Sequence, residues 1–278
     1  MTRDRVLLAV DLSYQTYRAT AAHRQLTCDG QFTGGLYGFL VSLAKQVNVT
    51  HATHVVVCED VKPYLRSEVY PEYKLLRKKN ADEELKALFQ ESLPMVLEAL
   101  DVIGIPVMGF KGFESDDGIG WLATTHRHRF HRIYGSSNDS DLYQLLRFDN
   151  FRLLKGGDMT EIVDRAKVFE QFGVDPEGYM LAQALKGTHN DVAGIPGVGE
   201  GKAFAAVKDP GQMRRWRERW AELIDRNQEL QRLPHPKFPH TTLPGMGTFK
   251  ARALYKFCGR YDIEVTGAMI SAFESICP

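Results

Sequence analysis

Acidic side chains at fixed spacings are the residues of this sequence best suited to chemistry. A Glu-x-Asp-Asp motif begins at residue 114, and an Asp-x-Asp pair follows at 139 and 141. The full candidate set is Asp11, Glu59, Glu114, Asp116, Asp117, Asp139, Asp141 and Asp191, with Asp60 next to Glu59. Carboxylates crowded into one small volume repel each other unless cations neutralise them. The set therefore predicts a site for metal ions.

The ligand type indicates which ion and which reaction to expect. Hard oxygen ligands favour Mg²⁺ or Mn²⁺ over zinc. Two such ions, about 3.5–4 Å apart, can activate a water and stabilise the departing oxygen of a phosphodiester. A single acid is more often a helix cap, because helix N-termini favour Asp and Glu. Several clusters at predicted strand ends favour a nuclease site with two ions.

Short apolar runs supply the elements that must position these acids. We expect strands at 6–10, 54–58, 102–108, 131–137 and 151–154, and helices at 34–47, 81–100 and 114–124. Asp11 and Glu59 would then follow strand ends, where open α/β sheets build their sites. The pattern predicts an α/β fold with a mostly parallel sheet flanked by helices.

Glycines punctuate the second part of the chain. We expect a sheet domain at 1–175 and a helical DNA-binding region at 176–278. The string I-P-G-V-G-E-G-K-A at 195–203 predicts a hairpin whose backbone N–H groups suit phosphate oxygens, with Gly197, Val198, Gly199 and Lys202 as contacts. A similar string recurs at 243–251. The alternative for either copy is a plain helix corner that uses glycine for its turn.

Cations and aromatic residues alternate at 66–79. Here Tyr70 and Tyr73 are suited to stack on bases of an unpaired strand, and Arg66 is a further expected DNA contact. The cations suited to attract phosphates are Lys74, Arg77, Lys78 and Lys79. The alternative is a solvated helix face.

Bulk properties fit a globular protein of the cytosol. The 278 residues are 44% hydrophobic and 25% charged, with a formal net charge of +0. The apolar run at 6–10 is too short for a signal sequence or a membrane span. The four cysteines are scattered, which indicates neither a disulfide framework nor a zinc site.

The order of these motifs resembles that of the 5′ nucleases, or flap endonucleases. These include bacteriophage 5′–3′ exonucleases and the 5′-nuclease domain of bacterial DNA polymerase I. The matching residues, from 6 to 207, are V-D-x-S near the start, R-x₆-Y-K-x-x-R from Arg66, E-x-D-D, D-x-D and the first glycine hairpin. The resemblance implies a PIN-like fold, a helix–three-turn–helix element for duplex DNA, and cleavage near junctions of single- and double-stranded DNA.

The resemblance also implies roles for individual residues. Ligands of the first Mg²⁺ or Mn²⁺ would be Asp11, Glu59 and Glu114, with Asp116 as a bridging acid and Asp117 as an extra acid. The second ion would be held by Asp139, Asp141 and Asp191. The scissile phosphate would lie under Lys74 and Arg77, and Tyr73 would stack on the substrate. The hairpin would bind DNA and K⁺.

The expected function is metal-dependent 5′–3′ exonuclease or flap endonuclease activity for primer or flap removal, in a bacterial cell or a phage-infected host. Expected partners are DNA with 5′ flaps, nicks or junctions and an RNA–DNA hybrid. Thr188 stands where phage members often have a further acid. The first alternative is therefore a non-catalytic protein that binds DNA junctions, and a second is an RNA-cleaving PIN-type toxin.

Overall fold

A six-stranded sheet forms the centre of the computed structural model, which describes residues 4–75, 82–188 and 190–277. Its strand order is β5-β4-β1-β6-β7-β8. The strands are β1 (Val6–Asp11), β4 (His54–Cys58), β5 (Val107–Met108), β6 (Arg132–Ser136), β7 (Phe151–Lys155) and β8 (Glu161–Val163). All neighbouring pairs are parallel except β7 and β8. This confirms the predicted α/β class with a mostly parallel sheet.

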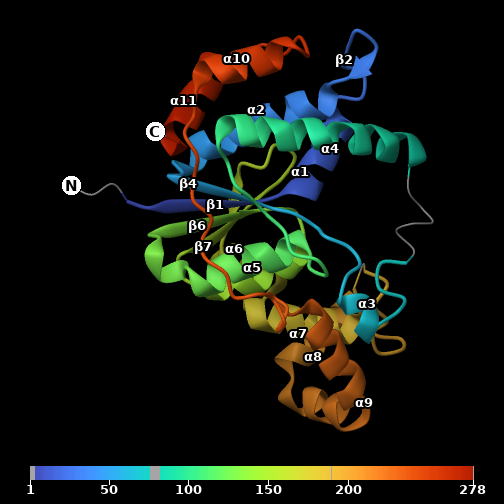
Figure 1. The fold of residues 1–278 in the computed structure, drawn as a ribbon. Helices are drawn as coiled ribbons and strands as arrows, with labels where there is room; N and C mark the ends of the chain where they lie inside the picture. The colour runs from blue at the N-terminus through green and yellow to red at the C-terminus, as the bar shows by residue number, and fades with distance from the viewer. Residues whose placement is uncertain (1–3, 76–81, 189, 278) are drawn as a thin grey trace.

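Helices cover both faces of the sheet (Figure 1). One face carries α1 (Leu12–Ala22), α2 (Gly34–Thr50), α4 (Glu83–Ile103), α10 (Ala251–Gly259) and α11 (Gly267–Ile276). The other carries α5 (Ser115–Thr125), η3 (Ser140–Arg147), α6 (Arg165–Phe172) and α7 (Pro176–Lys186). A short hairpin of β2 (Thr27–Cys28) and β3 (Gln31–Phe32) lies between α1 and α2. The remaining short pieces are α3 (Arg66–Val69) and η2 (Arg127–Arg129).

Alternation along β1 shows why this run forms a central strand. Leu7 and Ala9 lie in the core beneath α5, whereas Leu8 and Val10 lie in the core beneath α1 and α2. All four are 0–1% exposed. Since successive side chains point to opposite faces, a strand buried on both faces must be apolar at every position.

A helical module lies next to α5, on the side of α5 away from α2 and α4 (Figure 1). It contains α7, α8 (Glu200–Lys208) and α9 (Pro210–Gln231). The chain then runs back past the sheet, without helix or strand in residues 232–250, to α10 and α11 on the opposite face. Helices α7 to α11 therefore do not lie together as one region: α10 and α11 complete the core over α2 and α4. No helix among the described residues is long and apolar enough to cross a membrane.

The predicted strand at 102–108 is the clearest local difference. Helix α4 continues to Ile103, and Gly104 ends it in the left-handed region with φ +89°. Only Val107 and Met108 remain as strand β5. A glycine after the last helical turn is the commonest way for a helix to stop, so the apolar residues at 102–103 belong to the helix.

Candidate metal and nucleic-acid site

The candidate acids gather where the parallel strands end. Strand β1 ends at Asp11, Glu59 and Asp60 follow β4, and the loop after β6 leads to Asp139. Between β1 and β6 the strand order reverses, which is where α/β sheets open a crevice. A cavity of about 800 Å³ lies here, and its lining includes Asp11, Glu59, Asp60, Lys74, Glu114, Asp116 and Asp139.

Asp11 is fixed by its place at a strand–helix junction. One carboxylate oxygen accepts the Tyr14 N–H at 3.0 Å and caps α1. The other accepts the hydroxyl of Ser137, which directly follows the neighbouring strand β6, at 3.0 Å. Burial and the charge of Asp60 raise the pKa of Asp11 to about 7. The fold therefore holds this carboxyl group at the sheet edge, although burial and the charge of Asp60 disfavour its ionised form.

The start of α5 brings two more acids to the cavity. Glu114 is the N-cap, and Asp116 lies in the first turn. One carboxylate oxygen of Asp116 is buried without a hydrogen-bond partner among the described residues. Burial, with the nearby charges of Asp139 and Asp11, raises the pKa of Asp116 well above its usual value. A buried acceptor that lacks a donor is suited to a cation.

Glu114 is held by three side chains from one segment. Its Oε2 accepts hydrogen bonds from Tyr73 Oη at 2.9 Å and Arg66 Nη1 at 3.1 Å, and its Oε1 pairs with the Lys74 ammonium. Among the described residues, no three His, Cys, Asp or Glu side chains are grouped closely enough to hold an ion as they stand. In this arrangement Lys74, rather than a neighbouring acid, approaches Glu114.

Two of the three acids expected at a second ion line the same small hollow. Asp139 caps η3 by accepting the Asp141 N–H at 2.9 Å. Asp141 lies with Asp116, Asp139 and Asn190 around a small hollow next to the large cavity. Asp191, with a φ of 63°, is not among the residues that line either space.

Asp117 has surroundings different from those expected of a metal ligand. Its side chain is 0% exposed and forms an ion pair with Arg66, at 2.6 Å. It also accepts the Glu114 N–H at 3.1 Å as part of a capping box. The structure thus brings Asp116 to the cavity and turns Asp117 into the protein.

Two residues expected to contact DNA are also buried. Arg66 is 3% exposed and Tyr73 is 7% exposed, and both point at Glu114. In this structure the Arg66 guanidinium and the Tyr73 hydroxyl therefore contact Glu114, and little of either side chain is exposed for contact with DNA. Lys74 does line the cavity, with its ammonium 5.5 Å from the Tyr64 ring centre. Arg77 lies outside the described residues.

The first glycine hairpin has the expected form. It joins α7 to α8, where Gly197 has a φ of +75° and Gly199 is the N-cap of α8 with no side-chain cap. A Cβ at either glycine would meet open space. Lys202 is exposed and donates to the Gly197 carbonyl at 3.0 Å. The uncapped N–H groups at the start of α8 therefore face an open surface.

The second glycine string does not form a hairpin. It lies in the irregular 232–250 segment, where Gly247 donates its N–H to the Gly104 carbonyl at 2.7 Å. A Cβ on Gly247 would come within 2.9 Å of Gly104 Cα. Here glycine permits two backbones to touch, which is a packing role.

Three residues that hold the site were not singled out in the sequence. Ser137 donates to Asp11, Gln144 donates to the Asp141 carbonyl at 2.7 Å, and Asn190 accepts the Lys74 N–H at 3.0 Å through its carbonyl. Ser137 lies between strand β6 and the Asp-x-Asp pair, and Asn190 directly precedes Asp191, so both positions carried a signal, whereas Gln144 carried none.

The comparisons with known proteins agree with this architecture. The family model for the 5′-3′ exonuclease N-terminal resolvase-like domain matches residues 6–173. A 5′-3′ exonuclease of Bacillus subtilis is 32% identical over 213 residues, which are 73% of this chain and 70% of that protein. DNA polymerase I of Mycobacterium tuberculosis is 33% identical over 208 residues, 73% of this chain but only 22% of the polymerase, so the chain spans about a fifth of that relative.

Solved structures show the same fold over nearly the whole chain. A bacteriophage T5 flap endonuclease, in a complex with DNA and metal ions, matches with a TM-score of 0.69 at 18% identity and covers 97% of this chain and 100% of its own. Flap endonuclease-1 of Methanococcus jannaschii matches with a TM-score of 0.66 at 13% identity and covers 98% and 91%. At these identities the likeness concerns the fold, and the family follows from the sequence matches. The chain belongs to the 5′–3′ exonuclease family.

Proposed function

We propose that this protein is a divalent-metal-dependent 5′ nuclease that hydrolyses DNA phosphodiesters at junctions of single and double strands. The observation that carries the proposal is the buried oxygen of Asp116, which has no hydrogen-bond partner among residues 4–75, 82–188 and 190–277 and lies in a cavity shared with Asp11, Glu59, Glu114 and Lys74. Repulsion among these acids favours a bound cation, and Lys74 supplies a charge for phosphate.

The proposed ligands are all oxygen donors, which fits Mg²⁺ or Mn²⁺. Asp11, Glu59, Glu114 and Asp116 would hold the first ion, and Asp139, Asp141 and Asp191 would contribute to a second. When bound, such ions lower the pKa of a coordinated water and neutralise charge on the departing oxygen. The fit rests on the unpartnered Asp116 oxygen and on the raised pKa values of Asp11 and Asp116. Asp117 is left out of this set because it is paired with Arg66.

Lys74 exchanges partners in this mechanism. Its ammonium pairs with Glu114 and lies 5.4 Å from the Tyr73 ring centre. A scissile phosphate that enters the cavity would draw the ammonium away and free a Glu114 oxygen for the ion. Lys74 then offsets the negative charge that builds on the phosphate, which stabilises the transition state more than the ground state.

The glycine hairpin supplies the grip on the duplex. Backbone N–H groups at the start of α8 and the exposed Lys202 suit phosphate oxygens, and such contacts read no bases. Binding is therefore tolerant of sequence and weakens with salt. The proposed substrates are 5′ flaps and nicks, with an RNA–DNA hybrid as a further one, in primer or flap removal; K⁺ at the hairpin is part of the same proposal.

Cleavage of a 5′-end-labelled flap duplex tests the proposal, with a blunt duplex as the matched substrate. We expect Mg²⁺-dependent release from the flap end, no release in EDTA, and weak cutting of the blunt duplex. Tight binding of the junction without cutting in Mg²⁺ or Mn²⁺ would instead establish a non-catalytic junction-binding protein.

A further inference from the structure

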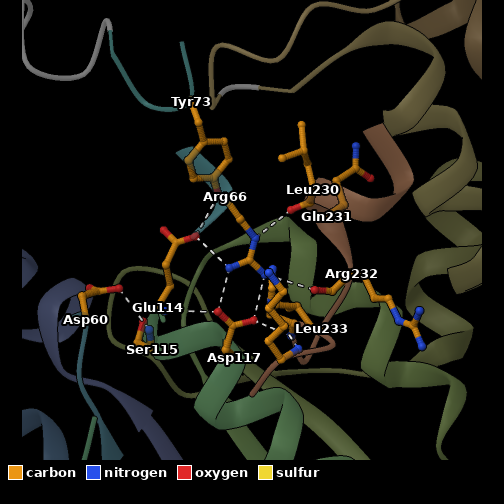
Figure 2. Close-up of polar contacts among 12 residues, drawn as sticks. Asp60, Arg66, Tyr73, Glu114, Ser115, Asp117, Leu230, Gln231, Arg232 and Leu233 are labelled. Atoms are coloured by element: carbon orange, nitrogen blue, oxygen red, sulfur yellow. Dashed lines mark hydrogen bonds and ion pairs between the residues drawn. The ribbon is translucent and has the colours of Figure 1, made fainter. Parts of the chain in front are cut away.

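A buried arginine connects the start of α5 to the end of α9 (Figure 2). A guanidinium has five N–H donors, and in Arg66 all five have acceptors. Nε donates to the Leu230 carbonyl at 2.8 Å, and Nη2 donates to the Arg232 carbonyl at 3.1 Å and to Asp117 at 2.8 Å. Nη1 donates to Asp117 at 2.6 Å and to Glu114 at 3.1 Å. One side chain therefore holds both a proposed metal ligand and the last turn of α9.

The carboxylate of Asp117 likewise has a hydrogen-bond donor at each of its acceptor positions. Its Oδ1 accepts hydrogen bonds from Arg66 and from the His235 N–H at 2.8 Å, and its Oδ2 accepts from Arg66 and from the Glu114 N–H. A carboxylate offers about four acceptor positions. No position is left for an ion, so Asp117 acts as an anchor for the segment 230–235, which we call the tether.

A second anchor holds the tether to η3. The side-chain amide of Gln144 donates to the Gln231 carbonyl at 2.8 Å and accepts the Leu233 N–H at 2.9 Å. The same amide donates to the Asp141 carbonyl at 2.7 Å. Since Asp141 belongs to the other group of acids, the tether is fastened to both halves of the proposed metal site.

At its other end the tether continues into α9, which holds the hairpin. The Asn227 amide on α9 donates to the carbonyls of Ala184 at 2.8 Å and Ala193 at 3.0 Å. Ala184 lies on α7, and Ala193 lies just before the glycine turn. Because Asn227 is 0% exposed, these bonds form in a dry interior and are costly to break. The Asn227 bonds, the last turn of α9 and the Arg66 bonds thus connect Ala193, two residues before the hairpin, to Glu114.

We infer that Arg66, Asp117 and Gln144 are positioning residues that fix the distance between the duplex grip and the catalytic acids, and so determine which phosphodiester is cut. The inference rests on the proposed function. If one DNA substrate contacts the hairpin with its duplex and Lys74 with its scissile phosphate, a rigid link between the two sites selects one nucleotide position. A loosened tether would let neighbouring phosphates reach the acids.

Product mapping at single-nucleotide resolution tests this inference. The wild-type protein, Asp117→Asn, Gln144→Met and Lys202→Ala would cut the same 5′-flap duplex in Mg²⁺. We expect one dominant product from the wild type, and a several-fold larger share of products from adjacent phosphodiesters with Asp117→Asn and Gln144→Met. Turnover should also fall by about 10–100-fold, as is typical when partners of a metal ligand are changed.

Lys202→Ala is the matched control, because it weakens the contact between the hairpin and duplex DNA and changes no residue of the tether. It should raise KM and keep the wild-type product. Slower cutting by Asp117→Asn and Gln144→Met with an unchanged single product would overturn the positioning role. If Asp117→Asn does not fold, Gln144→Met carries the test alone, since it alters no carboxylate. Absence of any wild-type cleavage would refute the proposed function itself, which separates the two failures.

Discussion

Asp116 and Asp117 are adjacent in the sequence but belong to two different regions. Asp116 faces the cavity, where one of its oxygens has no hydrogen-bond partner in the described part of the chain and neighbouring acids repel it. Asp117 faces the protein, where Arg66 and two backbone N–H groups satisfy it. Around Asp116 the carboxylate charges repel each other until a cation or proton neutralises them. Around Asp117 the carboxylate already has its hydrogen-bond donors and a cationic partner. The contrast separates residues suited to catalysis from residues that hold them.

The largest effect on stability should come from removing the cationic partner of Asp117. Arg66→Met would leave Asp117 buried without its partner, and losing one member of a buried pair costs about 3–5 kcal/mol. We expect the free energy of unfolding in urea to fall by that amount. A fall of less than about 1 kcal/mol, typical of an exposed pair, would show that the guanidinium is not buried as described.

Removing the charge of Asp116 in the cavity should lower activity and raise stability. Asp116→Asn should reduce flap cleavage by more than the roughly 100-fold typical of residues behind a metal ligand. It should also raise the melting temperature in EDTA, because the folded protein no longer buries that repelled charge. Retained turnover would remove Asp116 from the catalytic role.

The pH dependence of stability should be set by the cavity. The pKa of Asp11 is raised in the folded state from 3.8 to about 7, so the folded protein binds more protons than the unfolded chain between these values. Its contribution to stability is therefore present at low pH and is lost as pH rises toward about 7. In EDTA, melting temperature should fall over this range, and Asp11→Asn should flatten the slope.

Added Mg²⁺ should reverse that loss. Protons and metal compete for the same carboxylates, so the rise in melting temperature with Mg²⁺ should be larger at about pH 8 than at about pH 5. An equal rise at both pH values would place the bound ion away from these acids.

The two glycine strings should give the smallest effects. Gly247→Ala would press a Cβ to within 2.9 Å of Gly104 and should destabilise the fold by about 1–3 kcal/mol. Gly199→Ala has open space and should cost less stability than Gly247→Ala, with only the loss of a favoured N-cap residue, but it should weaken duplex binding. Equal unfolding curves for the two variants would contradict the packing role of Gly247.

Much of the fold could be predicted because its causes are local. Buried strands read as short apolar runs, and the acids that follow them reach the same sheet edge by topology alone. The fold class and the first hairpin's form followed from patterns contained in single segments, and the family followed from the order of several such motifs over residues 6–207.

What escaped prediction depends on partners far away in the sequence. Nothing in Glu-x-Asp-Asp says which aspartate turns inward, because Arg66 lies 51 residues before Asp117 and His235 lies 118 residues after it. The string at 243–251 matches the hairpin pattern, but its surroundings are set by Gly104. The return of α10 and α11 to the α2 face likewise has no local signal at the expected boundary near residue 175.

Calorimetric titration of Mn²⁺ into the wild type, Asp116→Asn and Asp117→Asn tests the central contrast most directly. We predict that Asp116→Asn loses a binding event or weakens it by at least about tenfold, whereas Asp117→Asn keeps the number of ions bound by the wild type. Unchanged binding by Asp116→Asn, or loss of an ion by Asp117→Asn, would contradict the assignment of these neighbouring aspartates to different regions.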